Sequence, residues 1–425
     1  MKKELLNQTI YQVYVRNYTK AGTFKGLIKK LDYIKDLGVD IIYLLPIHEI
    51  GVKAKKGTLG CPYSIQDYYS IAKELGTLED FKKLIKEIHA RDMKIMMDIV
   101  FNHSSRDSVL LNDHQDWYWH DKNGNLGTKV GDWSDVYDLN HDNLELEEYL
   151  ANNVKYWSDL GVDGFRFDVA ALIPMSFFRI LRNKIGSKPI LLAESADPDF
   201  VKYLRLINAV NVTDAELYEC FDIEYNYDIF RFLRMFFEKP CYVTKFAVED
   251  ALHNQMSYLP TDGMKINCLE NHDINRIASY FKGNALKNIT ALSFFIKGTA
   301  FVYGGQEVKA THRPSLFEKE TIPMKVKDVE FHNFIKDCIA FKSSDFNKEI
   351  IDSFVIKNKN KLVFTIENVY PTFKLFGIFN VSNKPEIIES ERLENGQYID
   401  LLTNKIVEVA DHKIEVFEPL ILRKM

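Results

Sequence analysis

Four apolar segments of the sequence end in, or lead into, an acidic side chain. The carboxylates concerned are Asp98, Asp168, Glu194 and Asp273. A single acidic residue in such a position is explained by capping of the helix that follows. Four of them in one chain indicate a shared site, provided that the fold brings the ends of their segments together.

Positive or polar side chains accompany these carboxylates. Arg166 lies two residues before Asp168 and therefore shares its face of an extended strand. His103 follows the first of the four segments, and His272 directly precedes the last carboxylate. Two close carboxylates beside a cation suit the cleavage of a glycosidic bond. That reaction needs a proton on the leaving oxygen and a negative group beneath the developing oxocarbenium ion.

The surroundings of Asp168 and Glu194 predict different charges. Arg166 would hold Asp168 ionised, whereas a nearby negative charge would raise the pKa of Glu194 and keep it protonated. Neighbouring strands lie ~4.8 Å apart, so the two carboxyl groups can approach to ~5–5.5 Å, as in retaining enzymes, rather than the ~6.5–9.5 Å of inverting ones. The carboxylate that attacks the sugar as nucleophile must be ionised, which favours Asp168. Asp273 is the rival candidate for this role, and the position of Arg166 beside Asp168 argues against it.

Strand and helix patterns alternate along the chain, and this alternation decides where the carboxylates lie. Seven strands are expected from β-branched or continuous apolar runs, and an eighth is expected near residues 208–221. Helical spacing of apolar residues separates them, with Thr77 as an N-cap. The expected strands are 9–15, 40–45, 94–100, 163–168, 189–194, 264–270 and 299–305, and the expected helices include 24–37, 81–88, 174–185, two within 227–258, 286–296 and 329–341.

Eight strand–helix units predict a (β/α)8 TIM barrel over residues 1–343, with a short inserted loop domain at 104–143 after the third strand. In such a barrel the carboxyl ends of all strands meet at one rim. A doubly wound open sheet is the alternative fold, but no GxGxxG follows the first strand. Residues 344–425 alternate in polarity without helical runs, which predicts a C-terminal antiparallel β-sandwich domain.

Composition excludes several classes of protein. Hydrophobic residues make up 46% and charged residues 27% of the 425 residues, which excludes disordered and coiled-coil chains. The sequence has 55 Lys and Arg against 60 Asp and Glu, which gives a net charge of −5. This charge does not indicate a nucleic-acid partner. No signal peptide or membrane span is apparent, and five scattered cysteines suit reduced thiols, so we expect a cytoplasmic protein without a membrane partner.

The same segments carry a resemblance to a known family. DIVFNH, GFRFD, the strand ending in Glu194, and ENHD resemble the four short regions that mark the alpha-amylase family of glycoside hydrolases. GVDIIYLLPI, PYSIQDYYSI, VYDLN and GTAFVYGGQE resemble further family segments in the correct order, so the likeness spans residues 9–310. The family also carries a β-domain after its barrel.

The resemblance implies a role for each matching residue. It implies that Asp168 is the nucleophile, Glu194 the general acid/base, and Asp273 a stabiliser of the transition state. The substrate-binding residues that we expect alongside this catalytic trio are Tyr63, His103, Arg166, His272 and Arg276. Tyr63 would stack on the sugar, the two histidines would hydrogen-bond to it, and Arg166 would position the nucleophile. Bracing of a loop or pairing on a helix are alternatives for Arg276, and Asp98 is expected to brace Arg166.

The sequence departs from the family after the expected nucleophile, and it leaves one family feature, a structural calcium, undecided. Ala171 and Leu172 stand where many amylases have a lysine and a histidine, which puts the leaving-group subsites and starch specificity in question. In calcium-bearing relatives a structural ion bridges the inserted region to the barrel. The matching ligands would be the oxygen donors Asn102 and Asp138. A structural calcium is therefore left open, whereas no organic cofactor is expected.

The resulting expectation is a retaining α-glycosidase that acts on an oligosaccharide or polysaccharide α-glucan: maltodextrins, starch or glycogen fragments. The alternatives are a transglycosidase, a glucanotransferase, an α-glucosidase or a trehalose- or sucrose-active enzyme of the same family. A further alternative is a catalytically inactive subunit of a membrane transporter. Such a protein would need a membrane anchor and should have lost the catalytic carboxylates, whereas this sequence keeps all three. A metal-dependent hydrolase built on His103, His272 and Asp273 lacks a helix with paired histidines.

Overall fold

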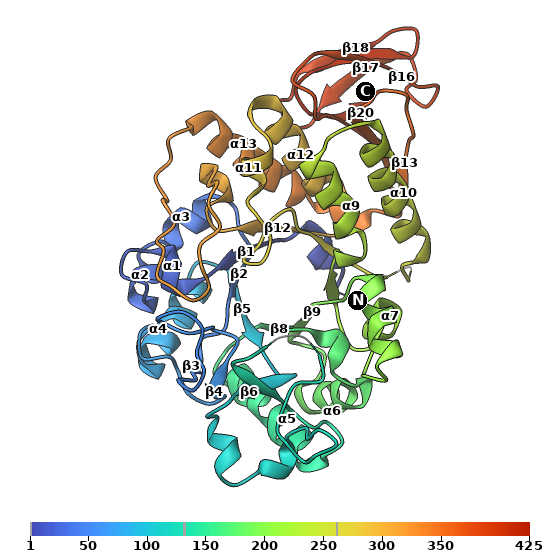
Figure 1. Cartoon of the computed structure of the whole chain (residues 1–425). Coiled ribbons are helices and arrows are strands. Elements are labelled where there is room, and N and C mark those ends of the chain that lie inside the picture. Colours follow the sequence, from blue (N-terminus) through green and yellow to red (C-terminus); the bar gives the residue numbers. More distant parts are fainter. Residues whose placement is uncertain (1, 131–132, 261) are drawn as a thin grey trace.

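A closed barrel of eight parallel strands forms the centre of the molecule (Figure 1). The computed structural model describes residues 2–130, 133–260 and 262–425. The prediction of a TIM barrel is confirmed. In order around the barrel, its strands are β1 (Thr9–Val13), β12 (Thr299–Tyr303), β11 (Lys265–Asn267), β10 (Ile223–Tyr225), β9 (Ile190–Ala193), β8 (Gly164–Phe167), β5 (Lys94–Ile99) and β2 (Ile41–Leu44).

The barrel strands are apolar because both of their faces are covered. Every residue of β1, β2, β8, β9 and β12 is buried, as the continuous apolar runs predict. The placement of the eighth strand at 208–221 was wrong, since β10 begins at Ile223. Thr213 and Glu216 form a capping box that starts the short helix α8 (Asp214–Leu217) inside that range.

Helices surround the barrel, as Figure 1 shows. Thr77 caps α4 through a capping box with Asp80, as expected. The helix expected at 24–37 is split in two. The α-helices are α1 (Val15–Tyr18), α2 (Phe24–Ile28), α3 (Leu31–Asp36), α4 (Leu78–His89), α5 (Leu144–Asp159), α6 (Met175–Ile185), α7 (Pro198–Leu206), α8, α9 (Tyr227–Glu238), α10 (Tyr242–Tyr258), α11 (Ile277–Tyr280), α12 (Gly283–Phe295) and α13 (Val329–Lys342).

Two small antiparallel hairpins follow barrel strands. The first, after β2, pairs β3 (Glu49–Ile50) with β4 (Ile65–Asp67). The second, after β5, pairs β6 (His103–Ser105) with β7 (Val136–Asp138) and closes the predicted inserted loop. Short 3-10 helices are η1 (Lys3–Asn7), η2 (Val109–Asn112), η3 (Gln115–Trp117), η4 (Ala170–Leu172), η5 (Gln306–Val308) and η6 (Asp345–Glu349).

The C-terminal part is an antiparallel β-domain, as predicted, and it packs against α12. The rings of Phe295 and Phe379 lie 5.6 Å apart, and Asn368 Nδ2 donates to the Phe295 carbonyl at 2.8 Å. The domain boundary at residue 344 stays a prediction. The main sheet has the order β13 (Asp352–Val355), β14 (Val363–Val369), β15 (Lys374–Asn380), β20 (Leu420–Lys424), β17 (Gly396–Asp400) and β18 (Ile406–Val409), and β16 (Glu386–Glu389) pairs with β19 (Lys413–Val416).

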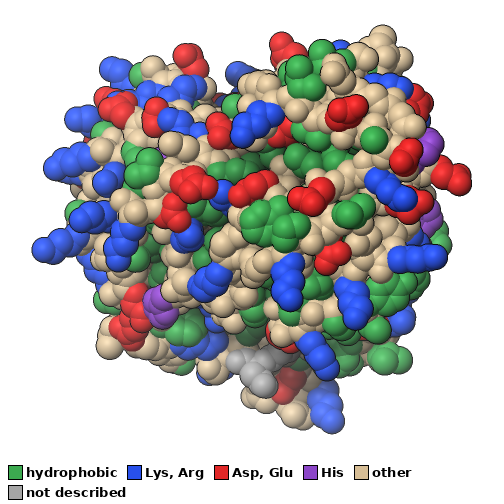
Figure 2. All heavy atoms as spheres, turned by 90° about the horizontal axis from the view of Figure 1, so that it is seen from above, with side chains coloured by type: hydrophobic (Ala, Val, Ile, Leu, Met, Phe, Trp, Pro, Cys, Tyr) green, Lys and Arg blue, Asp and Glu red, His purple; other side chains and the backbone are tan. Residues whose placement is uncertain are grey.

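The surface and the cysteines fit the composition. On the face drawn in Figure 2, acidic and basic side chains are interspersed. The five cysteines carry free thiols. Within the described ranges, no helix has both the length and the apolar character that crossing a membrane requires.

Candidate active site

The three predicted catalytic carboxylates line one pocket at the carboxyl ends of the barrel strands. Asp168 directly follows β8 and Glu194 directly follows β9, and these two strands are hydrogen-bonded neighbours. Asp273 lies in the loop after β11. The pocket that all three line has a volume of about 230 Å³. The fold therefore brings together side chains that are 105 positions apart in the chain (168 to 273).

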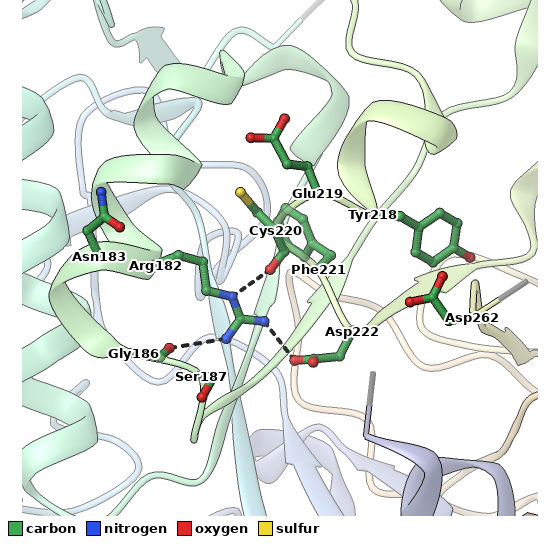
Figure 3. A pocket seen from close by; sticks show the side chains of 10 residues that line it. All are labelled: Arg182, Asn183, Gly186, Ser187, Tyr218, Glu219, Cys220, Phe221, Asp222 and Asp262. Atoms are coloured by element: carbon green, nitrogen blue, oxygen red, sulfur yellow. Dashed lines mark hydrogen bonds and ion pairs between the residues drawn. The ribbon is translucent and has the colours of Figure 1, made fainter. Parts of the chain in front are cut away.

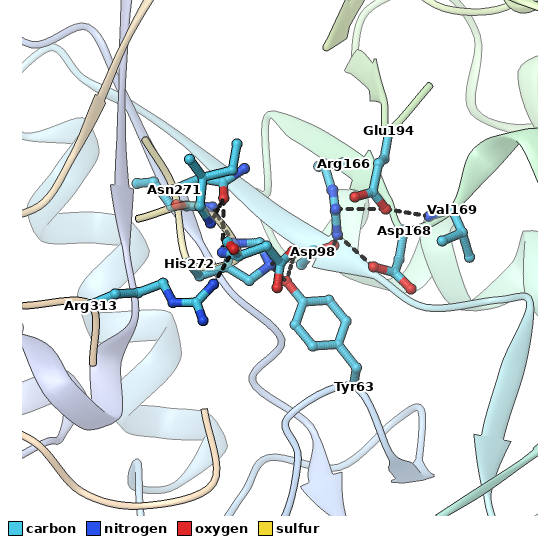
Figure 4. A network of polar contacts seen from close by, with 12 residues as sticks. Tyr63, Asp98, Arg166, Asp168, Val169, Glu194, Asn271, His272 and Arg313 are labelled. Carbon is cyan, nitrogen blue, oxygen red and sulfur yellow. Dashed lines mark hydrogen bonds and ion pairs between the residues drawn. The ribbon is translucent and has the colours of Figure 1, made fainter. Parts of the chain in front are cut away.

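Arg166 joins Asp98, Asp168 and Glu194 (Figure 4). Its Nη1 donates to Asp98 Oδ1 at 2.7 Å and to Asp168 Oδ1 at 2.9 Å. Its Nη2 lies 2.9 Å from Glu194 Oε2, in an ion pair without hydrogen-bond geometry. Arg166 is wholly buried and does not line the pocket. It contacts the nucleophile candidate Asp168, as the expected positioning role requires, and it offers no surface for direct binding of a sugar.

The backbone of Val169 holds the other carboxylate. Its N–H donates to Glu194 Oε2 at 2.7 Å. Val169 has φ 39° and ψ 47°, a left-handed conformation that is rare for β-branched residues and costs on the order of 1–3 kcal/mol. Within the described chain, Glu194 Oε1 and Asp168 Oδ2 have no hydrogen-bond partner, so each carboxyl group has one oxygen held and one free.

Burial raises the pKa of both Asp168 and Glu194, and the positive charge of Arg166 opposes this rise in both. The expectation that Arg166 would hold Asp168 ionised was therefore wrong, because burial outweighs its positive charge there and the pKa of Asp168 is raised well above its ordinary value. Only Asp168 receives a hydrogen bond from it, but Glu194 shares its charge. Because the two carboxyl groups contact one guanidinium in a buried site, they titrate as a pair.

Asp98 is enclosed beneath the pocket and has no exposed surface. Its Oδ2 accepts from the hydroxyls of Tyr43 at 2.6 Å and Tyr63 at 2.9 Å, while Oδ1 accepts from Arg166. Both oxygens are thus occupied by protein donors. The prediction that Asp98 braces Arg166 from the adjacent strand is confirmed.

A second chain of contacts leads to Asp273. The Tyr63 hydroxyl lies 2.7 Å from His272 Nε2, which in turn lies 3.0 Å from Asp273 Oδ2. Gln12 Nε2 lies 3.1 Å from the other ring nitrogen of His272. Partial burial opposes ionisation of Asp273, but His272 lowers the pKa of this carboxyl to about 2. Asp273 is therefore ionised although it does not contact Arg166. The position of Arg166 beside Asp168 thus no longer argues against Asp273 as the nucleophile.

Two further predicted residues differ in their access to the pocket. His103 lines it, and burial lowers the pKa of its imidazole to about 4, so the ring is neutral at pH 7. Arg276 is wholly buried, and its guanidinium donates to Glu270 Oε1 at 2.7 Å and to the Gly304 carbonyl at 2.9 Å. It does not line the pocket, so its substrate-binding assignment was wrong and it braces the loop instead.

The proposed calcium ligands do not fit a calcium ion as they lie. Asp138 Oδ2 accepts the Lys129 N–H at 2.6 Å, and its Oδ1 lies 3.5 Å from the amide nitrogen of Asn102. Burial raises the pKa of Asp138 to about 6. Calcium takes 6–8 oxygen ligands, whereas the described residues contain no group of three or more His, Cys, Asp or Glu side chains arranged to hold a metal.

Sequence reasoning missed part of the pocket wall. Several lining side chains come from loops that are brought to the pocket by long-range contacts, and no local sequence pattern distinguishes these side chains from other loop residues. Trp133 is the exception, since an aromatic residue in a polar loop is a signal, and its ring lies 5.2 Å from that of His103. The missed lining residues are Lys56, Cys61, Trp133, Asp135, Val136, Val169 and Leu316.

A different pocket, of about 370 Å³, surrounds Arg182 (Figure 3). Arg182 donates to the Cys220 carbonyl at 2.6 Å and to Asp222 Oδ2 at 2.7 Å, and Lys2 pairs with the same carboxylate. Asp222 also accepts the N–H of Leu191 near the start of β9. The pocket therefore lies at the amino-terminal rim, where barrel residues serve stability.

Comparisons with known proteins agree with this geometry. The family model "Alpha amylase, catalytic domain" matches residues 11–351, and "Bacterial Alpha amylase C-terminal domain" matches residues 356–422. An oligo-1,6-glucosidase from Bacillus cereus is 26% identical over 85% of this chain and 75% of its own length. The crystal structure of an alpha-amylase from Lactobacillus plantarum has 37% identity, a TM-score of 0.93 and full coverage of both chains. A maltogenic alpha-amylase, AmyB from Thermotoga neapolitana, has 31% identity and a TM-score of 0.87 over 99% of each chain.

Proposed function

The chain belongs to the alpha-amylase family of glycoside hydrolases, and on this premise we propose that it hydrolyses α-glucosidic bonds in maltodextrins, starch or glycogen fragments with retention of configuration. The observation that carries the proposal is the contact of one guanidinium, that of Arg166, with both Asp168 and Glu194. The two carboxyl groups come from neighbouring strands. The reacting sugar fits between their free oxygens.

Asp168 is the proposed nucleophile. Arg166 holds its Oδ1, so the free Oδ2 attacks the anomeric carbon and forms a covalent glycosyl-enzyme as the glycosidic bond breaks. Strands ~4.8 Å apart support a carboxyl separation of ~5–5.5 Å, which leaves no room for a water between Asp168 and the sugar.

Glu194 is the proposed general acid and base. Val169 holds its Oε2, so the proton shared by the carboxyl pair is delivered from the free Oε1 to the leaving oxygen. The same carboxylate then takes a proton from water as the water attacks the glycosyl-enzyme and releases Asp168.

Three residues are proposed to bind the sugar in the cleaved subsite. Asp273, ionised and half exposed (51%), accepts hydrogen bonds from sugar hydroxyls that strengthen in the transition state. His103 donates to the same sugar, and Tyr63 lies against its ring. His272, predicted as a substrate-binding residue, is buried and does not line the pocket, and its ring nitrogens contact Tyr63, Asp273 and Gln12, so it is proposed to position Asp273 instead. We also propose cytoplasmic residence, which the free thiols support. Recovery of most activity outside the cells of the host would contradict that location.

Proton NMR of the product tests the mechanism. Maltotetraose is incubated with the protein, and the anomeric signals are followed before mutarotation mixes them. Retention predicts that the α-anomer of the newly released sugar appears first. An initial β-anomer would show inversion and overturn the double-displacement mechanism.

A further inference from the structure

The pocket has a wall on the side opposite Glu194. Around the barrel, β9 and β1 are separated by four steps in either direction. Glu194 follows β9, so the loops after β1, β2 and β12 stand across the pocket from it, and the loop after β5, two strands away, forms the adjoining side. These loops contribute Lys56, Asp135 and Leu316 to the lining.

An ion pair joins two of these loops. Lys56 Nζ, in the loop between β3 and β4, lies 2.8 Å from Asp135 Oδ1, in the segment that leads into β7. Asp135 is almost completely buried, and the Ser64 hydroxyl donates to its backbone carbonyl at 3.0 Å. The Lys56–Asp135 pair therefore forms a fixed part of the wall.

Hydrogen bonds tie the same β3–β4 loop to the segment after β12. The Thr58 N–H donates to Glu318 Oε1 at 2.8 Å, and the Leu59 N–H donates to the Phe317 carbonyl at 3.1 Å. The buried Arg16 donates to the carbonyls of Gly60 at 3.0 Å and Leu316 at 2.8 Å. Three loops thus form one continuous barrier.

The pocket is small. Its volume is about 230 Å³, below the ~300–1,000 Å³ of most ligand sites. A volume below that range favours a single sugar unit over a longer segment of an α-glucan. A second sugar on the closed side would overlap Leu316 or the Lys56–Asp135 pair.

We propose that the protein is exo-acting: the pocket takes the single glucosyl unit at a free non-reducing end and releases glucose. The inference rests on the proposed function, because it uses the position of the acid. Glu194 protonates the leaving oxygen on C1, so the rest of the chain extends past Glu194. The sugar's O4 then points at the wall, where an internal unit would carry its next neighbour. Lys56, Asp135 and Leu316 are the specificity-determining residues.

The test compares 4-nitrophenyl α-maltoheptaoside with the same compound blocked by a 4,6-ethylidene group at its non-reducing end. Glucose is expected as the first product from the free compound, and the blocked compound should react at least ~100-fold more slowly, the order of discrimination that a shaped pocket provides. Comparable rates on both compounds, or maltose or a longer sugar as the first product, would overturn the inference. No cleavage of either compound would instead contradict the proposed function, and the inference would fall with it.

Variants of the wall connect this specificity to Lys56. Lys56→Ala removes the ion pair and should raise the blocked-to-free rate ratio at least ~10-fold, since the excluded substrate gains space. Lys55→Ala is the matched control, because Lys55 lies in the same loop but donates to the Thr58 carbonyl and does not line the pocket. Thermal unfolding verifies that both variants are folded. An unchanged ratio in folded Lys56→Ala would show that this pair does not set the specificity.

Discussion

The backbone N–H of Val169 donates to Oε2 of Glu194 at 2.7 Å, from a residue held at φ 39°. The residue after the proposed nucleophile thereby fixes the proposed acid on the next strand. The left-handed turn directs the N–H across the strand gap. Backbone strain at this position serves the orientation of a carboxylate.

Replacement of Val169 tests whether this strain is present. Glycine adopts positive φ freely, whereas alanine keeps the penalty of a left-handed conformation, ~1–2 kcal/mol. Glycine also loses ~0.5–1 kcal/mol to greater freedom in the unfolded chain. Val169→Gly is therefore expected to be more stable than Val169→Ala by about 0.5–1 kcal/mol in denaturant unfolding. The reverse order, which is usual at ordinary positions, would contradict the strained conformation.

Glu194→Gln removes the proton donor while retaining the shape of the side chain. The kcat on maltotetraose should fall by ~10²–10⁴, the usual contribution of general acid catalysis. α-Glucosyl fluoride needs no protonation to lose its leaving group, so glycosylation of the variant by this substrate should be affected far less in single-turnover measurements. Equal losses on both substrates would argue that Glu194 is not the acid.

Arg166→Lys keeps the charge but loses the planar fork that contacts both Asp168 and Glu194. Misplacement of the reacting groups is expected to lower kcat by ~10² with little change in KM. The control is Arg276→Lys, a buried arginine that braces a loop, which should lower Tm more than kcat. A rise in KM at constant kcat for Arg166→Lys would indicate a substrate-binding role instead.

Asp138 is expected to reduce stability when it ionises. Its pKa is raised from 3.8 to about 6 in the folded state, so the cost of ionisation appears as pH rises from about 4 through about 6. Asp138→Asn avoids this cost, and above pH 6 it should be more stable than the wild type by on the order of 3 kcal/mol.

Unfolding curves at pH 4 and pH 7 measure that difference, and a chelator at pH 7 provides a second readout. Because the carboxylate accepts the Lys129 N–H and the site does not fit calcium, Tm should not change with chelator. A lower Tm with chelator, together with destabilisation by Asp138→Asn, would restore the calcium site.

The barrel and the placement of its carboxylates could be predicted because buried parallel strands have a clear apolar signature. Asp168 and Glu194 directly follow such runs. The eighth strand, Ile223–Tyr225, is too short for that signature, and the valines upstream of it favoured a strand in the wrong place.

The features of the site that could not be predicted from the sequence are contacts between side chains that lie far apart in the chain. The burial of Arg276 follows from Glu270 and the Gly304 carbonyl, and the Lys56–Asp135 wall joins residues 79 positions apart (56 to 135). The second contact of Arg166, with Glu194, follows from strand pairing geometry rather than from any local pattern.

The identity of the nucleophile is the most direct test of the account, because Asp168 and Asp273 both line the pocket and His272 keeps Asp273 ionised. The protein is incubated with 5-fluoro-α-glucosyl fluoride, which slows release of the glycosyl-enzyme, and then digested and sequenced by mass spectrometry. The account predicts a single fluoroglucosyl label on Asp168. A label on Asp273, or inactivation without any covalent label, would contradict it.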